Sequence, residues 1–125
     1  MLSLLLRVVY ISAVTVAALD NGAALIPPRG VTTWELFDFN VSDAKIRSLA
    51  DSIVEVGLRE AGYEILWLDD GWPLCAEFEG SNGTSKCRTP APRGTNGSII
   101  PDPLKFPFGL ASTVAYVHSK GLKFG

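Results

Sequence analysis

The sequence predicts an α/β fold: the N-terminal portion of a (β/α)8 TIM barrel, with about three β-strands and two helices. Strand-like apolar segments alternate with amphipathic helical segments, which implies right-handed crossovers and a parallel sheet. No Gly-rich turn follows the first strand, as a Rossmann fold would require. Aromatic and acidic residues follow the strands, where barrels carry their chemistry. A complete barrel needs about 250 residues, so this 125-residue chain is expected to be incomplete, with about a third of one.

The composition is that of an ordinary globular protein, with 47% hydrophobic residues and a net charge of -2. No basic run or patch indicates a nucleic-acid partner. The single histidine and the two cysteines do not have the spacing of a zinc site. We therefore expect neither a metal nor a cofactor.

The first residues resemble a targeting segment. Residues 2–18 are almost wholly apolar and end in the small residues Val16-Ala17-Ala18, as at a signal-peptidase site. We expect a cleaved secretory signal over residues 1–18 and a mature chain over residues 19–125. The alternative is an uncleaved membrane anchor, for which this segment is at the short limit of length.

The mature chain opens with a rigid Pro-rich turn at 27–30 and a β-rich run from Val31 to Phe37, which we expect to be the first strand. Trp34 lies near the end of this run. It is either a core aromatic or, if exposed at the strand end, a flat face for the C–H side of a sugar or another amphipathic ligand.

A long helix is expected next, with Ser42 or Asp43 as its N-cap and Gly62 as its left-handed C-terminal cap. Apolar residues recur at spacings of three and four, which is the pattern of a helix with one buried stripe. The stripe consists of Ile46, Leu49, Ala50, Ile53, Val54, Leu58 and Ala61. It indicates packing in the core and no ligand site.

The second strand, Ile65 to Leu68, has no polar break, which is typical of a strand buried on both faces. It ends directly in two adjacent carboxylates, Asp69 and Asp70, followed by Gly71 and Trp72. One interpretation is that an aspartate caps the following turn. Two carboxylates at the end of a buried strand favour a site for a polar ligand, because such groups are costly to bury without partners.

The segment from Pro73 to Pro107 is rich in Gly, Pro, Ser, Thr and Asn, and we expect a long loop without regular structure. Cys75 and Cys87 lie within it. In a secreted chain this pair suggests a disulfide, and the alternative is two free thiols. The loop is interpreted as a stapled wall of the site or as a variable surface insertion. Glycosylation sequons occur at Asn40, Asn82 and Asn96.

A second helix is expected to begin at 107–109 and to end at Gly121, with the third strand over 122–125. His118 lies in its last turn, where a cation interacts favourably with the helix dipole. We therefore interpret His118 as an exposed dipole partner and not as a catalyst.

Several motifs in order resemble the melibiase-type glycoside hydrolases, that is, α-galactosidases and the related α-N-acetylgalactosaminidases. The resemblance extends from residue 19 to residue 125. The matching segments are Leu19-Asp20-Asn21-Gly22, Pro28-x-Gly30 before Trp34, Ala61-Gly62-Tyr63 through Asp69-Asp70-x-Trp72, Asp102-Pro103-x-Lys105-Phe106-Pro107-x-Gly109, and Val117-His118-Ser119-Lys120-Gly121-Leu122-Lys123. Five matches at compatible spacing make the resemblance specific.

The resemblance implies a secreted or lysosomal/vacuolar retaining α-galactosidase, with a C-terminal β-sandwich after the barrel. It implies that Trp34 packs on the sugar ring and that Asp69 and Asp70 accept hydrogen bonds from galactose hydroxyls. The expected partner is then an α-galactoside, with no nucleic acid and no membrane after signal cleavage. A homodimer is one assembly open to the full-length protein. The nucleophile and the acid/base lie on later strands, so residues 19–125 are expected to contain no catalytic residue and to be inactive alone.

Two departures from the family pattern leave the subtype open. The residues before Trp34 are Val31-Thr32-Thr33 instead of the usual aromatic-Asn or aromatic-His pair, and Gly71 replaces a frequent cysteine. The alternatives are an α-N-acetylgalactosaminidase, a non-catalytic sugar-binding homologue, and a different barrel enzyme that uses the Asp pair for a metal or a phosphosugar.

Overall fold

The computed structural model describes residues 22, 25–79 and 86–125. The predicted signal peptide 1–18, the mature start at 19–21 and the sequon at Asn82 lie outside the described residues. Within the described part, no helix combines the length and apolarity needed to cross a membrane.

Three short strands form a parallel sheet in the order β1-β2-β5. They are β1 (Gly30–Thr32), β2 (Ile65–Trp67) and β5 (Lys123–Phe124). The pairs Val31↔Leu66 and Leu66↔Phe124 fix the register, so the carboxyl ends of the strands meet at one edge of the sheet. This confirms the predicted parallel sheet and the strands at 65–68 and 122–125.

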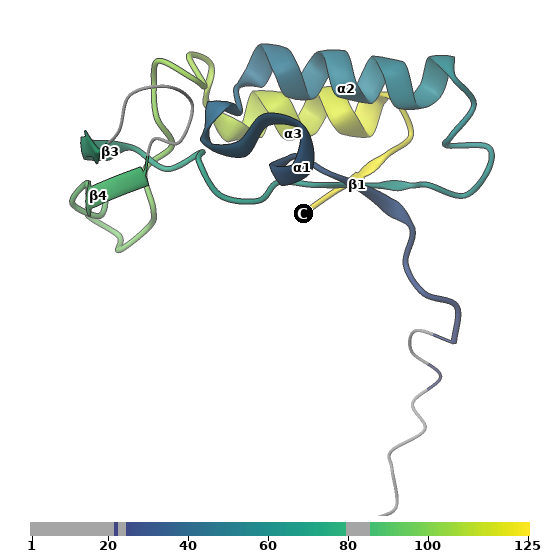
Figure 1. Ribbon diagram of the computed structural model, residues 1–125, viewed down its shortest axis with the longest axis horizontal. Helices are drawn as coiled ribbons and strands as arrows, with labels where there is room; N and C mark the ends of the chain where they lie inside the picture. Colours follow the sequence, from purple (N-terminus) through teal and green to yellow (C-terminus); the bar gives the residue numbers. More distant parts are fainter. Residues whose placement is uncertain (1–21, 23–24, 80–85) are drawn as a thin grey trace, which may run out of the picture.

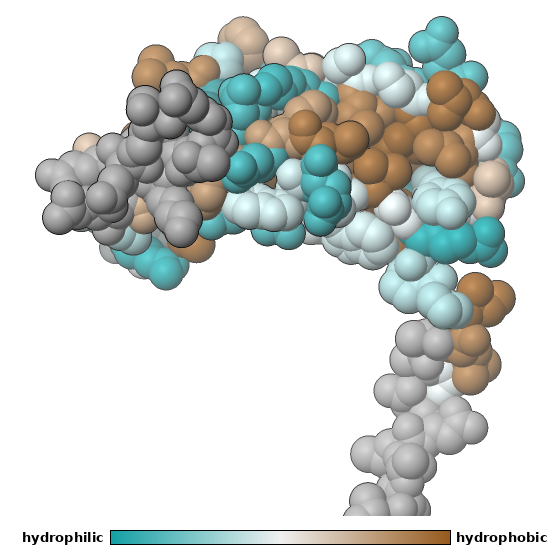
Figure 2. Space-filling model, viewed as in Figure 1, coloured by the Kyte–Doolittle hydropathy of each residue, from teal (hydrophilic) through white to brown (hydrophobic). Residues whose placement is uncertain are grey.

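Two helices, α2 (Asp43–Glu55) and α3 (Gly109–Ser119), lie side by side along one face of the sheet (Figure 1). The core lies between them and the sheet. On the face shown in Figure 2, apolar residues gather in a central area beside these helices, with polar residues around it. The buried core residues are Val41, Ile46, Ala50, Ile53, Leu66, Phe106, Val117 and Leu122.

The predicted first strand is wrong beyond Thr32. Trp34–Phe37 forms a short helix, α1, and Asp38–Asn40 a 3-10 turn, η1. The β-rich sequence favours a strand, but β1 is only as long as the three residues of β2 with which it pairs. Beyond that pairing the backbone groups must find other partners, and Phe37 N donates to Thr33 O at 2.9 Å.

The N-cap of α2 is Ser42, one of the two residues expected there, and its side chain accepts a hydrogen bond from Lys45 N. The predicted end at Gly62 is wrong, because the helix stops at Glu55. Gly57 takes a positive φ of 78°, and the bonds from Gly57 N to Val54 O and from Leu58 N to Ile53 O make a Schellman motif. Apolar spacing alone does not reveal this end, because the apolar pattern continues beyond the last residue of the helix.

Helix α3 ends as predicted. Gly121 has a φ of 74°, and its amide donates to His118 O. His118 is exposed, in agreement with its interpretation as a surface residue.

The segment 73–107 is not wholly irregular, which corrects the predicted loop. It contains an antiparallel hairpin, β3 (Cys75–Glu79) and β4 (Lys86–Pro90), that stands at one end of the molecule (Figure 1). The predicted disulfide between Cys75 and Cys87 is present, with an S–S distance of 2.06 Å. The disulfide therefore joins two paired strands of this hairpin.

Candidate functional site

The candidate residues lie where β1 and β2 end. Trp34 follows β1 after one intervening residue, and Asp69 and Asp70 follow β2 after Leu68. Adjacent parallel strands bring their carboxyl ends together, so the two loops that leave these strands are neighbours. In barrels this edge carries the functional residues.

Thr33 ties these two strand ends together. Its amide donates to Trp67 O at 2.9 Å, and its hydroxyl accepts from Asp69 N at 3.0 Å. The side chain is only 1% exposed. In the sequence, Thr33 stands out only as part of the expected first strand and as a departure from the family pattern. The signal that points to its role is a hydroxyl side chain at the end of a strand.

Trp34 is partly exposed and is not a member of the buried core, so the expectation of a core aromatic is wrong. Its ring packs edge-to-face on Phe39, with centroids 5.1 Å apart and planes at 78°. Phe39 comes from η1, after Asp38, whose carboxylate accepts from Phe39 N at 2.6 Å. No sequence pattern marks Phe39, because its contact with Trp34 depends on the turn of the chain after β1.

Asp69 and Asp70 are both exposed. Asp69 Oδ1 accepts from Asp70 N, and Asp70 Oδ1 accepts from Gly71 N, each at 2.7 Å. Both aspartates therefore shape the turn, as the first interpretation required. An exposed carboxylate with a second oxygen also keeps the capacity to accept hydrogen bonds from a ligand.

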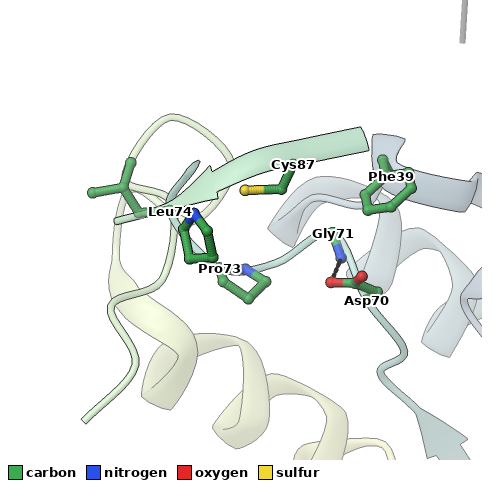
Figure 3. Close-up of a pocket in the computed structure, with 7 residues that line it drawn as sticks. Phe39, Asp70, Gly71, Pro73, Leu74 and Cys87 are labelled. Carbon is green, nitrogen blue, oxygen red and sulfur yellow. Dashed lines mark hydrogen bonds between the residues drawn. The ribbon is translucent and has the colours of Figure 1, made fainter. Parts of the chain in front are cut away.

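A cavity of about 220 Å³ opens beside this turn (Figure 3). Figure 3 shows Asp70 and Gly71 at its wall, joined by their hydrogen bond, with the Phe39 ring and Cys87 of the hairpin nearby. The full lining is Phe39, Asp70, Gly71, Pro73, Leu74, Cys87 and Pro90. The hairpin thus contributes to the wall beside Asp70, whereas Asp69 and Trp34 do not line the cavity.

Gly71 allows the two loops to approach each other. It has a φ of 86°, and a Cβ at this position would lie 2.8 Å from Phe39 Cα and 3.0 Å from Phe39 O. Only glycine meets both requirements. This explains in physical terms why this chain has a glycine directly after its Asp pair.

Lys105 reaches the same place from the segment before α3. Its ammonium donates to Phe39 O at 2.7 Å and to Gly71 O at 2.6 Å. Burial lowers the pKa of Lys105, and the charges of Asp102 and Asp70 partly oppose this shift. In the sequence, Lys105 stands out only as part of a family motif.

Comparison with known proteins decides the family. The model of the Melibiase_2 family, described as alpha galactosidase A, matches residues 27–125. The chain belongs to the Melibiase_2 family. It is 35% identical to a probable alpha-galactosidase of Dictyostelium discoideum over an alignment of 115 residues. This alignment covers 92% of this chain and 26% of the relative. It is 37% identical to an alpha-galactosidase of Coffea arabica over an alignment of 107 residues. This alignment covers 86% of this chain and 24% of the relative.

Solved structures agree with this membership. Alpha-galactosidase I from Mortierella vinacea superposes with a TM-score of 0.68 at 30% identity, covering 85% of this chain and 23% of that one. The alpha-galactosidase of Saccharomyces cerevisiae superposes with a TM-score of 0.66 at 28% identity. The superposition covers 84% of this chain and 20% of that one. This chain therefore spans about a quarter of the length of the relatives that it matches, and its fold is part of a barrel.

Proposed function

We propose that this chain is the N-terminal part of an α-galactosidase that, when complete, hydrolyses terminal α-D-galactosyl residues with retention. Trp34 packs against the sugar ring, and Asp69 and Asp70 accept hydrogen bonds from its hydroxyls. The observation that carries this proposal is the family match over residues 27–125, which includes the strand ends with these three residues.

The chemistry of the two carboxylates suits binding better than bond cleavage. A retaining glycosidase needs two carboxyl groups about 5–5.5 Å apart, one as nucleophile and one as acid/base. Asp69 and Asp70 each accept a hydrogen bond from the backbone of their own turn, which fixes their orientation. We assign the nucleophile and the acid/base to barrel strands that these residues do not include, so residues 19–125 alone are inactive.

We further propose that the protein passes through the secretory pathway and is glycosylated. The disulfide fits an oxidising compartment. Asn40 and Asn96 are exposed, as a glycan requires. The test is a mobility shift of the secreted protein on treatment with an N-glycosidase. An unchanged mobility would contradict glycosylation.

The test of the activity uses the complete polypeptide encoded by the gene, secreted from a eukaryotic host. It should hydrolyse p-nitrophenyl α-D-galactoside faster than the corresponding α-N-acetylgalactosaminide. Asp69→Ala and Asp70→Ala should each lose a charge-assisted hydrogen bond of about 1.5–3 kcal/mol, or about 10- to 150-fold in kcat/KM.

Glu55→Ala is the matched control, because Glu55 is an exposed carboxylate at the far end of α2. It should keep the wild-type kcat/KM. A complete protein that binds galactose without hydrolysing it would be a sugar-binding homologue and would overturn the assigned activity. Wild-type kcat/KM in both aspartate variants would overturn the assigned site.

A further inference from the structure

Lys105 connects two loops that are far apart in the sequence. Its ammonium donates to Phe39 O, in the segment after β1, and to Gly71 O, in the segment after β2. The partners lie 66 and 34 residues away along the chain. One positive charge therefore holds both loops at short hydrogen-bond distances, of the kind that charge-assisted bonds show.

Each of these loops carries one part of the candidate sugar site. Phe39 supports the Trp34 ring by an edge-to-face contact. Gly71 donates its amide to Asp70 Oδ1. The two carbonyls that Lys105 binds thus belong to the residue that supports the aromatic ring and to the residue that orients the carboxylate.

The lysine is itself held in place. Its carbonyl accepts from Asp43 N at 3.0 Å, which ties it to the first residue of α2. Its amide donates to Asp102 O, and the adjacent Phe106 is 2% exposed in the core. The ammonium therefore projects from a fixed backbone, which is what a positioning group requires.

We propose that Lys105 is a positioning residue for sugar binding, which sets the separation between the Trp34–Phe39 pair and the Asp70 carboxylate. This inference rests on the proposed function. It goes beyond the assignment of Trp34, Asp69 and Asp70, because Lys105 does not touch the substrate and acts through Phe39 and Gly71.

The experiment compares Lys105→Met and Lys105→Arg in the complete secreted protein. Methionine keeps an unbranched side chain but removes the donors and the charge, whereas arginine keeps both. Lys45→Met is the matched control: Lys45 Nζ donates to Asn40 O at 2.7 Å and so binds the first loop without reaching the second. The readouts are KM and kcat for p-nitrophenyl α-D-galactoside, and amide hydrogen exchange of residues 38–40 and 70–72.

We expect Lys105→Met to raise KM about tenfold or more with a smaller change in kcat, as the loss of binding shared by substrate and transition state predicts. Lys105→Arg should recover most of this loss, and Lys45→Met should keep the wild-type KM. A merely structural role would reduce the amount of active protein, and thus the apparent kcat, while leaving KM unchanged. That result would overturn the inference.

Hydrogen exchange separates this inference from the proposed function. In Lys105→Met, exchange should accelerate in both loops; in Lys45→Met, it should stay at the wild-type rate in residues 70–72. Unchanged exchange in Lys105→Met would overturn the link between the loops, whatever the activity. A wild-type protein that does not hydrolyse galactosides would overturn the proposed function instead.

Discussion

Replacement of Thr113 by valine tests the polar contact that joins the two helices. Thr113 is 0% exposed, and its hydroxyl donates to Asp43 Oδ1 at 2.6 Å. Asp43 is 8% exposed and also accepts from Arg47 Nε at 2.9 Å. Valine keeps the shape of threonine but removes the donor. Because the acceptor is charged, we expect the free energy of unfolding to fall by about 1.5–3 kcal/mol.

The pH dependence of this effect follows from the pKa of Asp43. Burial of the carboxyl raises its pKa, but the hydrogen bonds from Arg47 and Thr113 and the charge of Arg47 outweigh burial, so the pKa lies below its ordinary value of 3.8. A lowered pKa contributes stability above the unfolded-state pKa, and this stability is lost as the pH falls through the folded-state pKa. The difference between wild type and Thr113→Val should therefore shrink under strongly acidic conditions.

The assay is urea-induced unfolding of the complete protein at neutral and at strongly acidic pH. Thr113→Ser is the matched control, since it keeps the hydroxyl and removes the methyl group. The reasoning is refuted if the valine variant is as stable as the wild type at neutral pH. It is also refuted if the serine variant loses as much stability as the valine variant, because packing and not the hydrogen bond would then be responsible.

Three further predictions concern the site and the core. Gly71→Ala should lower both stability and kcat/KM, because its Cβ would lie 2.8 Å from Phe39 Cα at a φ of 86°; unfolding and kinetics together check this, and wild-type values would contradict it. The double replacement of Cys75 and Cys87 by serine should cost about 2–5 kcal/mol, measured by unfolding with and without reductant, and reductant should have no effect on the variant. Leu66→Ala, at 0% exposure in the core, should cost about 2–5 kcal/mol in the free energy of unfolding; a loss under about 1 kcal/mol would contradict the packing described.

The order of the three sheet strands and the two long helices could be predicted because it depends on local pattern. The apolar run at 65–68 is typical of an interior strand, and strand–helix alternation then favours parallel pairing. The disulfide followed from two cysteines in one short loop. The positions of Asp69 and Asp70 at a strand end could be predicted because they directly follow this apolar run.

Two of the errors arise from pairing between distant segments, whereas the early end of α2 is a local effect of Gly57. Trp34–Phe37 has a strand-like sequence but lies beyond the end of β2, so no partner remains for it and it folds into a helix. The hairpin within 73–107 pairs two strands, joined by the disulfide between Cys75 and Cys87, in a segment whose composition is typical of loops. Local propensity is a weak guide wherever such pairing decides.

The sequence by itself determined the parallel α/β arrangement, the caps at Ser42 and Gly121, and the presence of an aromatic residue and two carboxylates at strand ends. The caps and the strand ends depend on residues within a few positions of one another, and the parallel pairing follows from the alternation of strands and helices. Only the tertiary structure decided that Phe39 supports Trp34, and that Lys105 links their loop to Gly71. A lysine that bonds to main-chain carbonyls leaves no pattern in the residues it binds, because every residue has a carbonyl. Such a contact can be found only once the chain has folded.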